Sequence, residues 1–243
     1  MKQILFCLLV FSTALCSQTV LAQDGERINT DRPSFSASPF VVSPGVWQLE
    51  TGFHYTSIDS DTSVQSLPQA LLRYGWNDEV EFRITFPNLA RIDRPGDDDS
   101  GLSDAAIGVK IQLTDDSAST PLAFLAGLSL PTGDDGFTTD SWDPMIGVAW
   151  AHSRYFGTAT ITGYDGDYVF ENGVGANFAL KNGSSLFAEW QATLPDDGGS
   201  LQRLNGGWLW TPQNNLQWDI NASLGLNDRA PDFAFGGGFS YRF

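Results

Sequence analysis

The sequence is poor in cysteine, histidine and positively charged residues. Its only cysteines, Cys7 and Cys16, lie in an N-terminal stretch that we expect to be removed, which would leave the mature chain without disulfide or thiol chemistry. The chain carries 13 Lys+Arg against 29 Asp+Glu, a formal net charge of −16. Nucleic-acid phosphates must be neutralised by Lys and Arg. We therefore predict no nucleic-acid partner.

Long apolar runs are also missing after the first 22 residues, which excludes a bundle of membrane-spanning helices of about 20 apolar residues each. The N-terminus combines Lys2, an apolar run over 4–15 and the small-residue site Val20-Leu21-Ala22. This pattern is typical of a secretory signal. We expect residues 1–22 to be cleaved, which brings the mature net charge to about −17 because Lys2 is lost.

From about residue 45 the chain alternates apolar and polar residues with a period of two. Residues 79–86 alternate Val, Phe, Ile and Phe with Glu, Glu, Arg and Thr, and residues 216–224 show the same pattern. Only a strand whose two faces meet different media produces this period. The predicted strands are 46–57, 64–75, 79–87, 103–113, 121–130, 144–152, 155–164, 168–180, 185–194, 201–210, 216–225 and 233–243.

The connections between these strands separate a membrane barrel from a soluble β-sandwich. Links after even-numbered strands are short, such as 76–78 and 153–154, whereas links after odd-numbered strands, such as 88–102 and 131–143, are more often long or acidic. Aromatic residues also gather near strand ends on the apolar face, as in the interfacial girdles of membrane barrels. We predict an all-β, closed, antiparallel up-and-down transmembrane β-barrel of about twelve strands over 45–243, with short periplasmic turns and longer acidic extracellular loops.

Several stretches together resemble a known family. They are Thr30-Asp31-Arg32-Pro33-Ser34-Phe35-Ser36, Pro44-Gly45-Val46-Trp47-Gln48-Leu49-Glu50-Thr51-Gly52-Phe53, Leu72-Arg73-Tyr74-Gly75, Gly101-Leu102-Ser103-Asp104, Gly108-Val109-Lys110 and Leu130-Pro131-Thr132-Gly133-Asp134. Their order and spacing are similar to those of the outer-membrane transporter family of the meta-pathway of phenol degradation. The resemblance implies an outer-membrane barrel connected with the handling of aromatic compounds.

The C-terminal residues resemble the signal that barrel-assembly machinery recognises. Phe239, Tyr241 and Phe243 share one face of the last predicted strand. We expect this machinery as a partner, and the bacterial outer membrane, with its lipid and lipopolysaccharide, as the location.

Charged residues on the polar face of the strands are the first group of candidate functional residues. They are Glu50, Arg73, Glu81, Arg83, Asp104, Lys110, Glu171, Glu189, Arg203, Asp219 and Arg242. We predict that they face the lumen. They could line a selective pore, or they could form a paired network that fills the barrel, since buried charges need partners.

The segment 23–44 lacks alternation and contains Pro33, Pro39 and Pro44. It could fold into the lumen as a plug or lie in the periplasm.

The acidic loops, such as Asp97-Asp98-Asp99, lack the ligand spacing of an EF-hand. We predict solvated loops without a metal site, with a cation-bridged lipopolysaccharide contact as the alternative. No cofactor is expected.

The most probable role is passive passage of small molecules, hydrophobic or aromatic ones by family resemblance. A closed structural or surface-interaction barrel is the second hypothesis. A lipid-modifying enzyme is the third, and it is disfavoured because adjacent His152 and Ser153 point to opposite faces of a strand. We predict no enzymatic activity.

Overall fold

The computed structural model describes residues 27–196 and 198–243, and every regular element in them is a β-strand. The predicted signal 1–22 lies outside the described residues. The strands are β1 (Trp47–Ser57), β2 (Ser63–Gly75), β3 (Val80–Phe86), β4 (Leu89–Asp93), β5 (Asp99–Leu102), β6 (Ala105–Gln112), β7 (Leu122–Leu130), β8 (Asp143–His152), β9 (Tyr155–Tyr164), β10 (Asp167–Ala179), β11 (Ser184–Pro195), β12 (Leu201–Gln213), β13 (Leu216–Gly225) and β14 (Phe233–Arg242).

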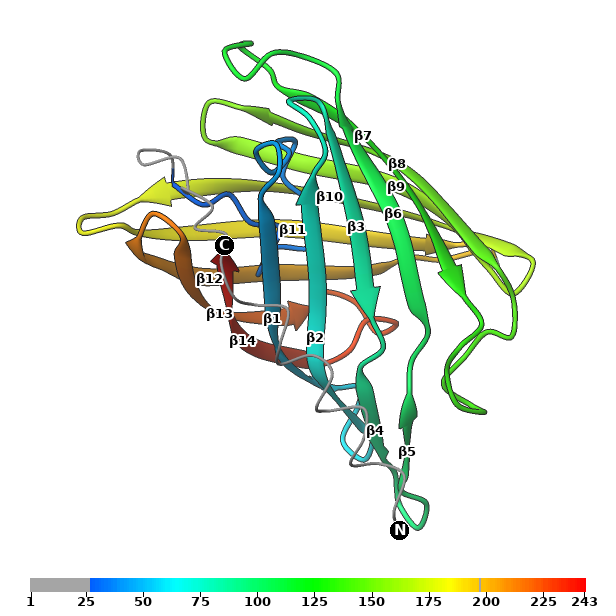
Figure 1. The fold of residues 1–243 in the computed structure, drawn as a ribbon. Coiled ribbons are helices and arrows are strands. Elements are labelled where there is room, and N and C mark those ends of the chain that lie inside the picture. Colours follow the sequence, from blue (N-terminus) through cyan, green and yellow to red (C-terminus); the bar gives the residue numbers. More distant parts are fainter. Residues whose placement is uncertain (1–26, 197) are drawn as a thin grey trace, which may run out of the picture.

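The strands form one sheet that closes on itself (Figure 1). Neighbours pair antiparallel around the ring, and β1 pairs with both β14 and β2. The last residue completes this seam, because Phe243 N donates to Trp47 O at 2.9 Å and Trp47 N donates to Phe243 O at 3.2 Å. Closure leaves the barrel wall without a free edge, which a lipid environment requires.

β3 and β4 together form one strand of the barrel wall, and β5 and β6 form another. The wall therefore has twelve strands, as predicted. β2 pairs with β3 along one half and with β4 along the other. The interruption falls at Pro87, which has no N–H for the ladder, and opposite it β5 is separated from β6 by Ser103 and Asp104. Asn88 and Ser103 bridge the interruption, with Ser103 N donating to Asn88 O at 2.9 Å.

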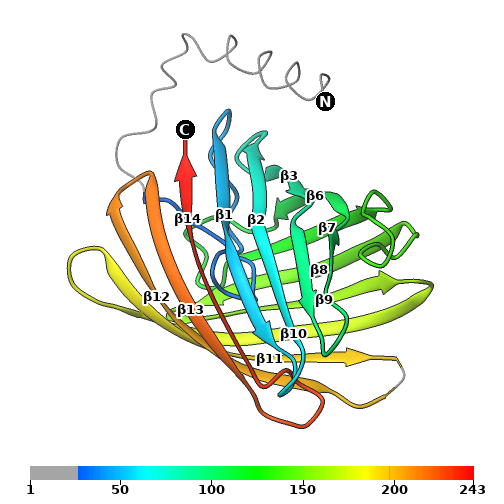
Figure 2. The same ribbon diagram turned by 90° about the horizontal axis from the view of Figure 1, so that it is seen from below.

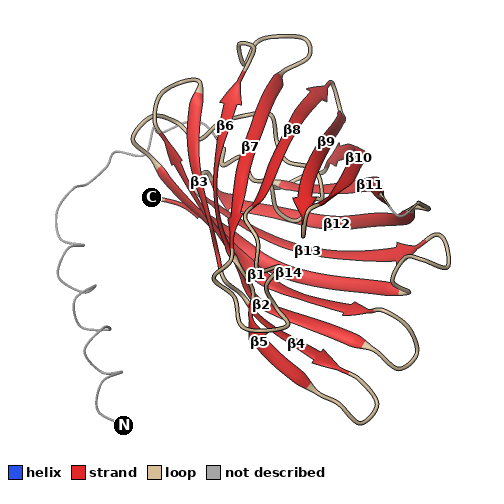
Figure 3. Ribbon diagram, turned by 90° about the vertical axis from the view of Figure 1, so that its right-hand side faces the viewer, coloured by secondary structure: helices blue, strands red, loops and turns tan. Residues whose placement is uncertain are grey.

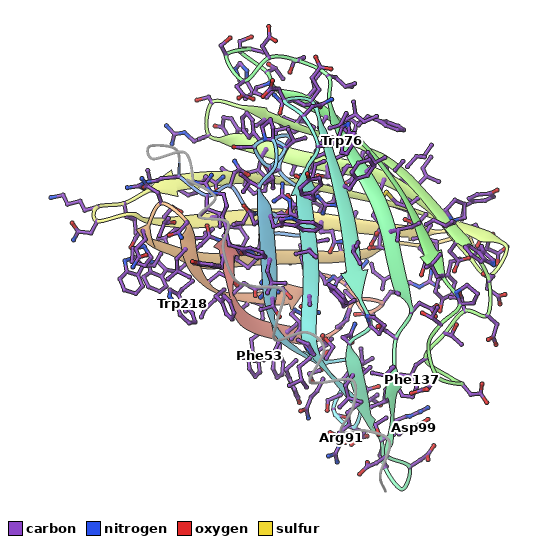
Figure 4. The ribbon with its side chains drawn as sticks, viewed as in Figure 1. Phe53, Trp76, Arg91, Asp99, Phe137 and Trp218 are labelled. Atoms are coloured by element: carbon purple, nitrogen blue, oxygen red, sulfur yellow. The ribbon has the colours of Figure 1, made fainter. Side chains whose placement is uncertain are left out.

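The prediction that 88–102 is an open loop is therefore wrong. β4 and β5 pair with each other and extend past the neighbouring strands (Figures 1 and 3). The acidic run at 97–99 suggested a loop, but only 94–98 connects the two strands. Phe137 of the following loop packs against Gly101, where a Cβ atom would clash with its ring (Figure 4).

The two ends of the barrel differ in charge more clearly than in loop length. The connection 113–121 at the short-turn end is long, and the connection 165–166 at the opposite end is short. The acidic residues nevertheless concentrate at the long-loop end, as in 97–99 and 134–135, whereas Arg154 and Lys181 lie in short turns.

The barrel is apolar outside and polar inside. Phe53 and Trp218 project outward (Figure 4), together with exposed Ile, Leu and Val side chains from most strands. The largest fully buried side chains are instead Arg73, Lys110, Gln48, Glu50 and Glu81. This distribution is typical of a barrel whose outer surface faces lipid. Among residues 27–196 and 198–243, no helix is long and apolar enough to cross a membrane.

An arginine on the outer surface should be costly only at mid-height of the wall. Ile220 lies midway along β13 and is 58 % exposed, whereas Leu226 follows the strand end and is 51 % exposed. We expect Ile220→Arg to lower the free energy of unfolding by about 2–4 kcal/mol and Leu226→Arg by about 0–1 kcal/mol. Urea titration in phospholipid vesicles measures both values, and equal losses would contradict a lipid-facing outer surface.

Candidate functional site: the filled lumen

The N-terminal segment was expected either to fold into the lumen or to lie in the periplasm. Its described residues lie in the lumen. Figure 2 shows the blue stretch before β1 inside the ring of strands. We call residues 28–44 the plug segment. It has no strand or helix, so its backbone N–H groups need acceptors from the wall.

Wall carboxylates supply several of these acceptors. Glu50 on β1 accepts from the backbone N of Asp31 at 3.0 Å and of Arg32 at 2.9 Å. Across the barrel, Glu189 on β11 accepts from the backbone N of Phe35 and of Ser36, each at 2.8 Å. Hydrogen bonds to ionised acceptors are stronger than neutral ones. The plug segment is therefore fixed from two opposite walls.

The side chain of Asp31 joins the plug segment to three cations. Its carboxylate lies 2.7 Å from Arg83 Nη2, 3.1 Å from Lys110 Nζ and 3.8 Å from Arg73 Nη1. Burial disfavours the charged form of Asp31, but Lys110, Arg73 and Arg83 outweigh it and hold the pKa of Asp31 well below its ordinary value. Asp31 is therefore ionised at neutral pH.

Two of the three cations, Arg73 and Arg83, also pair with wall glutamates. Arg73 Nη1 lies 2.7 Å from Glu50 Oε1, and its Nη2 lies 2.7 Å from Glu81 Oε2. Glu81 also pairs with Arg83 at 2.9 Å. We call this set the ion network; it consists of Asp31, Glu50, Arg73, Glu81, Arg83 and Lys110. Its three acids balance its three bases, so it can be buried without net charge.

A second ion pair ties the plug segment to β13. Arg32 Nη2 lies 3.1 Å from Asp219 Oδ1. The guanidinium passes over Gly52 and Gly238, where a Cβ atom would clash with it. The plug segment therefore excludes a side chain at both glycines, where a Cβ atom would also clash with the backbone oxygens of Gly237 and Thr51 on the paired strands.

The predicted lumen residues do not form one group. Glu50, Arg73, Glu81, Arg83 and Lys110 join the ion network, while Glu189 and Asp219 hold the plug segment separately. Arg203 lies over the Phe35 ring at 4.9 Å, and Glu171 accepts from Thr193 Oγ1 at 3.1 Å. Arg242 lies at the short-turn end, 3.4 Å from Asn214 O.

Asp104 departs from the predicted lumen set. Its carboxylate accepts from Thr132 N at 2.9 Å and Gly133 N at 2.8 Å, so it anchors the loop 131–142 at the rim. The prediction placed Asp104 in one continuous strand over 103–113. In the structure Ser103 and Asp104 lie between β5 and β6, so strand alternation does not apply to Asp104.

The remaining candidates lie on the outer surface or at the rim. Tyr241 and Phe243 are exposed and their rings stack at 6.1 Å, and Phe239 lies 5.4 Å from the Trp218 ring. His152 Nδ1 lies 3.0 Å from Thr120 Oγ1 at the short-turn end. Among the described residues, no group of three His, Cys, Asp or Glu side chains is placed to hold a metal ion.

Three pockets remain beside the plug segment. One, about 590 Å³, opens at the short-turn end beside β1, β6 and β14. The other two lie toward the wall formed by β7–β13. The outer pocket, about 240 Å³, is lined by Phe35, Leu125, Met145, Thr160, Thr162 and Gln191 among others. The inner pocket, about 350 Å³, reaches the short-turn end and includes Phe156, Asn177, Phe187, Leu209 and Gln217. Ala37 lines both pockets, and Thr158 Oγ1 is bonded to Ala37 N at 2.9 Å and Ala37 O at 3.3 Å. The Ala37–Thr158 contact therefore lies between the two pockets.

Sequence reasoning assigned no role to Asp31 and Arg32. They contact Lys110 and Asp219, which lie 79 and 187 positions away in the chain. The presence of charged residues in a segment without strand pattern was the one sequence feature that pointed to a role for Asp31 and Arg32. Their partners could not be predicted, because the partners come close only when the barrel closes.

The fold and the filled lumen together define a plugged β-barrel of the outer-membrane type. The family model "Putative MetA-pathway of phenol degradation" matches residues 30–243, and the chain belongs to this family. The sequence resemblance is thereby confirmed. No protein with curated annotation matches the chain.

Solved structures share the architecture at low identity. An outer-membrane channel from Pseudomonas putida F1 aligns with a TM-score of 0.68 at 15% identity, covering 88% of this chain and 100% of that one. The KdgM porin aligns with a TM-score of 0.54 at 9% identity, covering 80% of this chain and 99% of the porin. The translocator domain of the autotransporter NalP from Neisseria meningitidis aligns with a TM-score of 0.52 at 11% identity, covering 83% of this chain and 90% of that domain. Because a porin and a translocator share it, this fold does not select a cargo.

Neutralising Asp31 should loosen the plug segment and leave the barrel intact. Breaking one partner of a buried ion cluster costs about 3–5 kcal/mol, so Asp31→Asn should speed amide exchange of residues 28–42 by roughly a hundredfold or more. Hydrogen-exchange mass spectrometry measures this, with Asp59→Asn in an exposed loop as control. Unchanged exchange in the plug segment, or equal acceleration in β8–β12, would contradict the role of Asp31.

Proposed function

We propose that this protein is an outer-membrane channel that lets small uncharged molecules, hydrophobic or aromatic ones in particular, diffuse along one side of its lumen. The observation that carries this proposal is the position of the free space. The outer and inner pockets adjoin the wall of β7–β13, whereas the ion network occupies β1, β2, β3 and β6. A third pocket of about 590 Å³ opens beside β1, β6 and β14, but its lining includes the charged residues Arg27, Asp78, Asp116 and Arg242.

The walls of the outer and inner pockets are largely neutral. Threonine, amide, aromatic and aliphatic side chains supply most of the lining. The charged residues there are few and most are in ion pairs: Arg83 pairs with Asp31 and Glu81, and Arg32 pairs with Asp219, while Glu171 accepts a hydrogen bond from Thr193. An ion moving along this wall would lose hydration and gain little compensating charge, which is costly. A neutral solute loses much less.

Family membership supports the aromatic part of the proposal. The family is described by its connection with phenol degradation, and phenols are small, weakly polar and uncharged at neutral pH. The ion network would then act as the anchor of the plug segment and would set how much of the lumen stays free.

A series of para-substituted phenols of different charge tests this proposal. The protein is placed in vesicles with lipopolysaccharide in the outer leaflet, and an encapsulated phenol oxidase reports influx by its coloured product. We expect the protein to speed the influx of neutral 4-methylphenol at least about tenfold more than that of cationic tyramine or anionic 3-(4-hydroxyphenyl)propanoate, because burying an unpaired charge costs well above 1.4 kcal/mol.

Vesicles without protein provide the baseline in this assay. Equal acceleration of all three phenols would show an open, unselective pore. No acceleration of any of them would favour the second hypothesis, a closed structural barrel, for which the anchored plug segment is the supporting observation.

The contact between Ala37 and Thr158 should limit the rate of passage. Thr158→Val keeps the shape of the side chain and removes both hydrogen bonds to Ala37, each worth about 0.5–1.5 kcal/mol. We expect influx of 4-methylphenol to rise by roughly fivefold or more. The matched control is Thr160→Val, two positions along the same face, since Thr160 lines the same outer pocket while the hydrogen bonds to Ala37 come from Thr158. An equal effect of both variants would show that the Ala37–Thr158 contact does not limit the rate of passage.

A further inference from the structure

The outer pocket contains a buried polar group that the wall leaves without a partner. Gln191 lines this pocket from β11 and is 8 % exposed, and its Oε1 atom accepts no hydrogen bond from the described residues. A shielded amide oxygen without a donor is unfavourable, so such groups in native proteins require an explanation. Most other buried carboxylate and amide groups of the lumen are engaged by the plug segment or by each other.

The neighbours of Gln191 leave space beside its amide. The residue opposite it on β10 is Gly173, which has no side chain, and the residue opposite it on β12 is Arg203, whose guanidinium lies over Phe35. A Cβ atom at Gly173 would come within 2.5 Å of Ser36 Oγ and 2.9 Å of Glu189 Oε1. The glycine therefore accommodates the plug segment and also keeps the wall beside Gln191 open.

The rest of the outer pocket combines an aromatic ring with aliphatic and hydroxyl groups. Phe35 is held in place by its backbone N–H to Glu189 and by Arg203 over its ring. Leu125 and Met145 add apolar surface, and Thr160 and Thr162 add hydroxyl groups on β9. Binding sites for small molecules typically have this composition, apolar walls with a few placed polar groups.

The volume limits the ligand to a small one. The outer pocket measures about 240 Å³, and a cavity of about 150 Å³ is enough to bind benzene. One ring with small substituents fits within this volume.

We propose that the outer pocket is a binding site for single-ring aromatic compounds that carry a hydroxyl group, with the hydroxyl donating to Gln191 Oε1 and the ring lying against Phe35, Leu125 and Met145. This inference rests on the proposed function, because it names the class of solute for the same lumen. It makes the passage selective for hydroxylated rings over equally small rings that lack a donor.

Two fluorinated compounds isolate the hydroxyl donor. 4-Fluorophenol and 4-fluoroanisole share the ring and the oxygen, but only the phenol can donate a hydrogen bond. Their dissociation constants are measured by fluorine NMR with the full-length protein in lipid nanodiscs, and empty nanodiscs correct for partition into lipid. We expect the protein to bind 4-fluorophenol about five- to tenfold more tightly, the worth of one buried hydrogen bond.

Three variants separate the polar and apolar parts of the site. Gln191→Leu should abolish the preference for the phenol and leave the affinity for 4-fluoroanisole equal or higher. Phe35→Leu should raise the dissociation constants of both compounds by a similar factor, about two- to tenfold. Asn205→Leu is the matched control, because it removes another buried lumen amide that does not line the outer pocket, and it should keep the preference.

The outcomes also separate this site from the proposed channel. Equal binding of the two compounds by the unmodified protein, or a preference that survives in Gln191→Leu, overturns the site. If Gln191→Leu loses its heat-modifiable folded form, the Phe35→Leu result and the comparison of the two compounds on the unmodified protein still decide. A clear binding preference without accelerated influx in the vesicle assay would support the site and contradict the channel; influx without preference would do the reverse.

Discussion

The plug segment crosses the barrel without forming a helix or strand, so its backbone amides depend on acceptors from the wall. Glu50, Glu81 and Glu189 supply them from β1, β3 and β11. Buried carboxylates need cations, and Arg73, Arg83 and Lys110 balance the charges of Glu50, Glu81 and the plug residue Asp31. Most other features of the lumen follow from this requirement.

One consequence is a lumen divided into two unlike sides. The ion network and the plug segment fill the side toward β1, β2, β3 and β6. Free volume lined mainly by threonine, amide and aromatic side chains remains beside β7–β13, whereas the pocket beside β1, β6 and β14 has a charged lining. A neutral wall beside a fixed plug is suited to neutral solutes, and this division connects the fold to the function proposed for it.

A second consequence concerns glycine. Gly52 and Gly238 leave room for the Arg32 guanidinium, and Gly173 leaves room for Ser36. In the sequence these residues read as small residues of strands and turns. In the structure they are positions where the plug segment approaches the wall too closely for a side chain. The plug segment and the strand sequences are therefore matched to each other.

The strands, the two faces of each strand and the outward aromatic residues could be predicted from the order of residues, because a period of two is a local property of the backbone. The sequence also separated an acidic end of the barrel from the other end. It did not reveal β4 and β5, since the acidic run 97–99 has the composition of a loop and Pro87 interrupts the pattern. For the same reason Asp104 was assigned to the lumen although it anchors a loop at the rim.

The pairing of the lumen charges could not be predicted in this way, because closure of the barrel brings together residues that lie far apart in the chain. Asp31 reaches Lys110, and Arg32 reaches Asp219 across 187 positions. Sequence spacing contains no information about such pairs: they exist only once β14 has paired with β1 and the plug segment lies inside the ring.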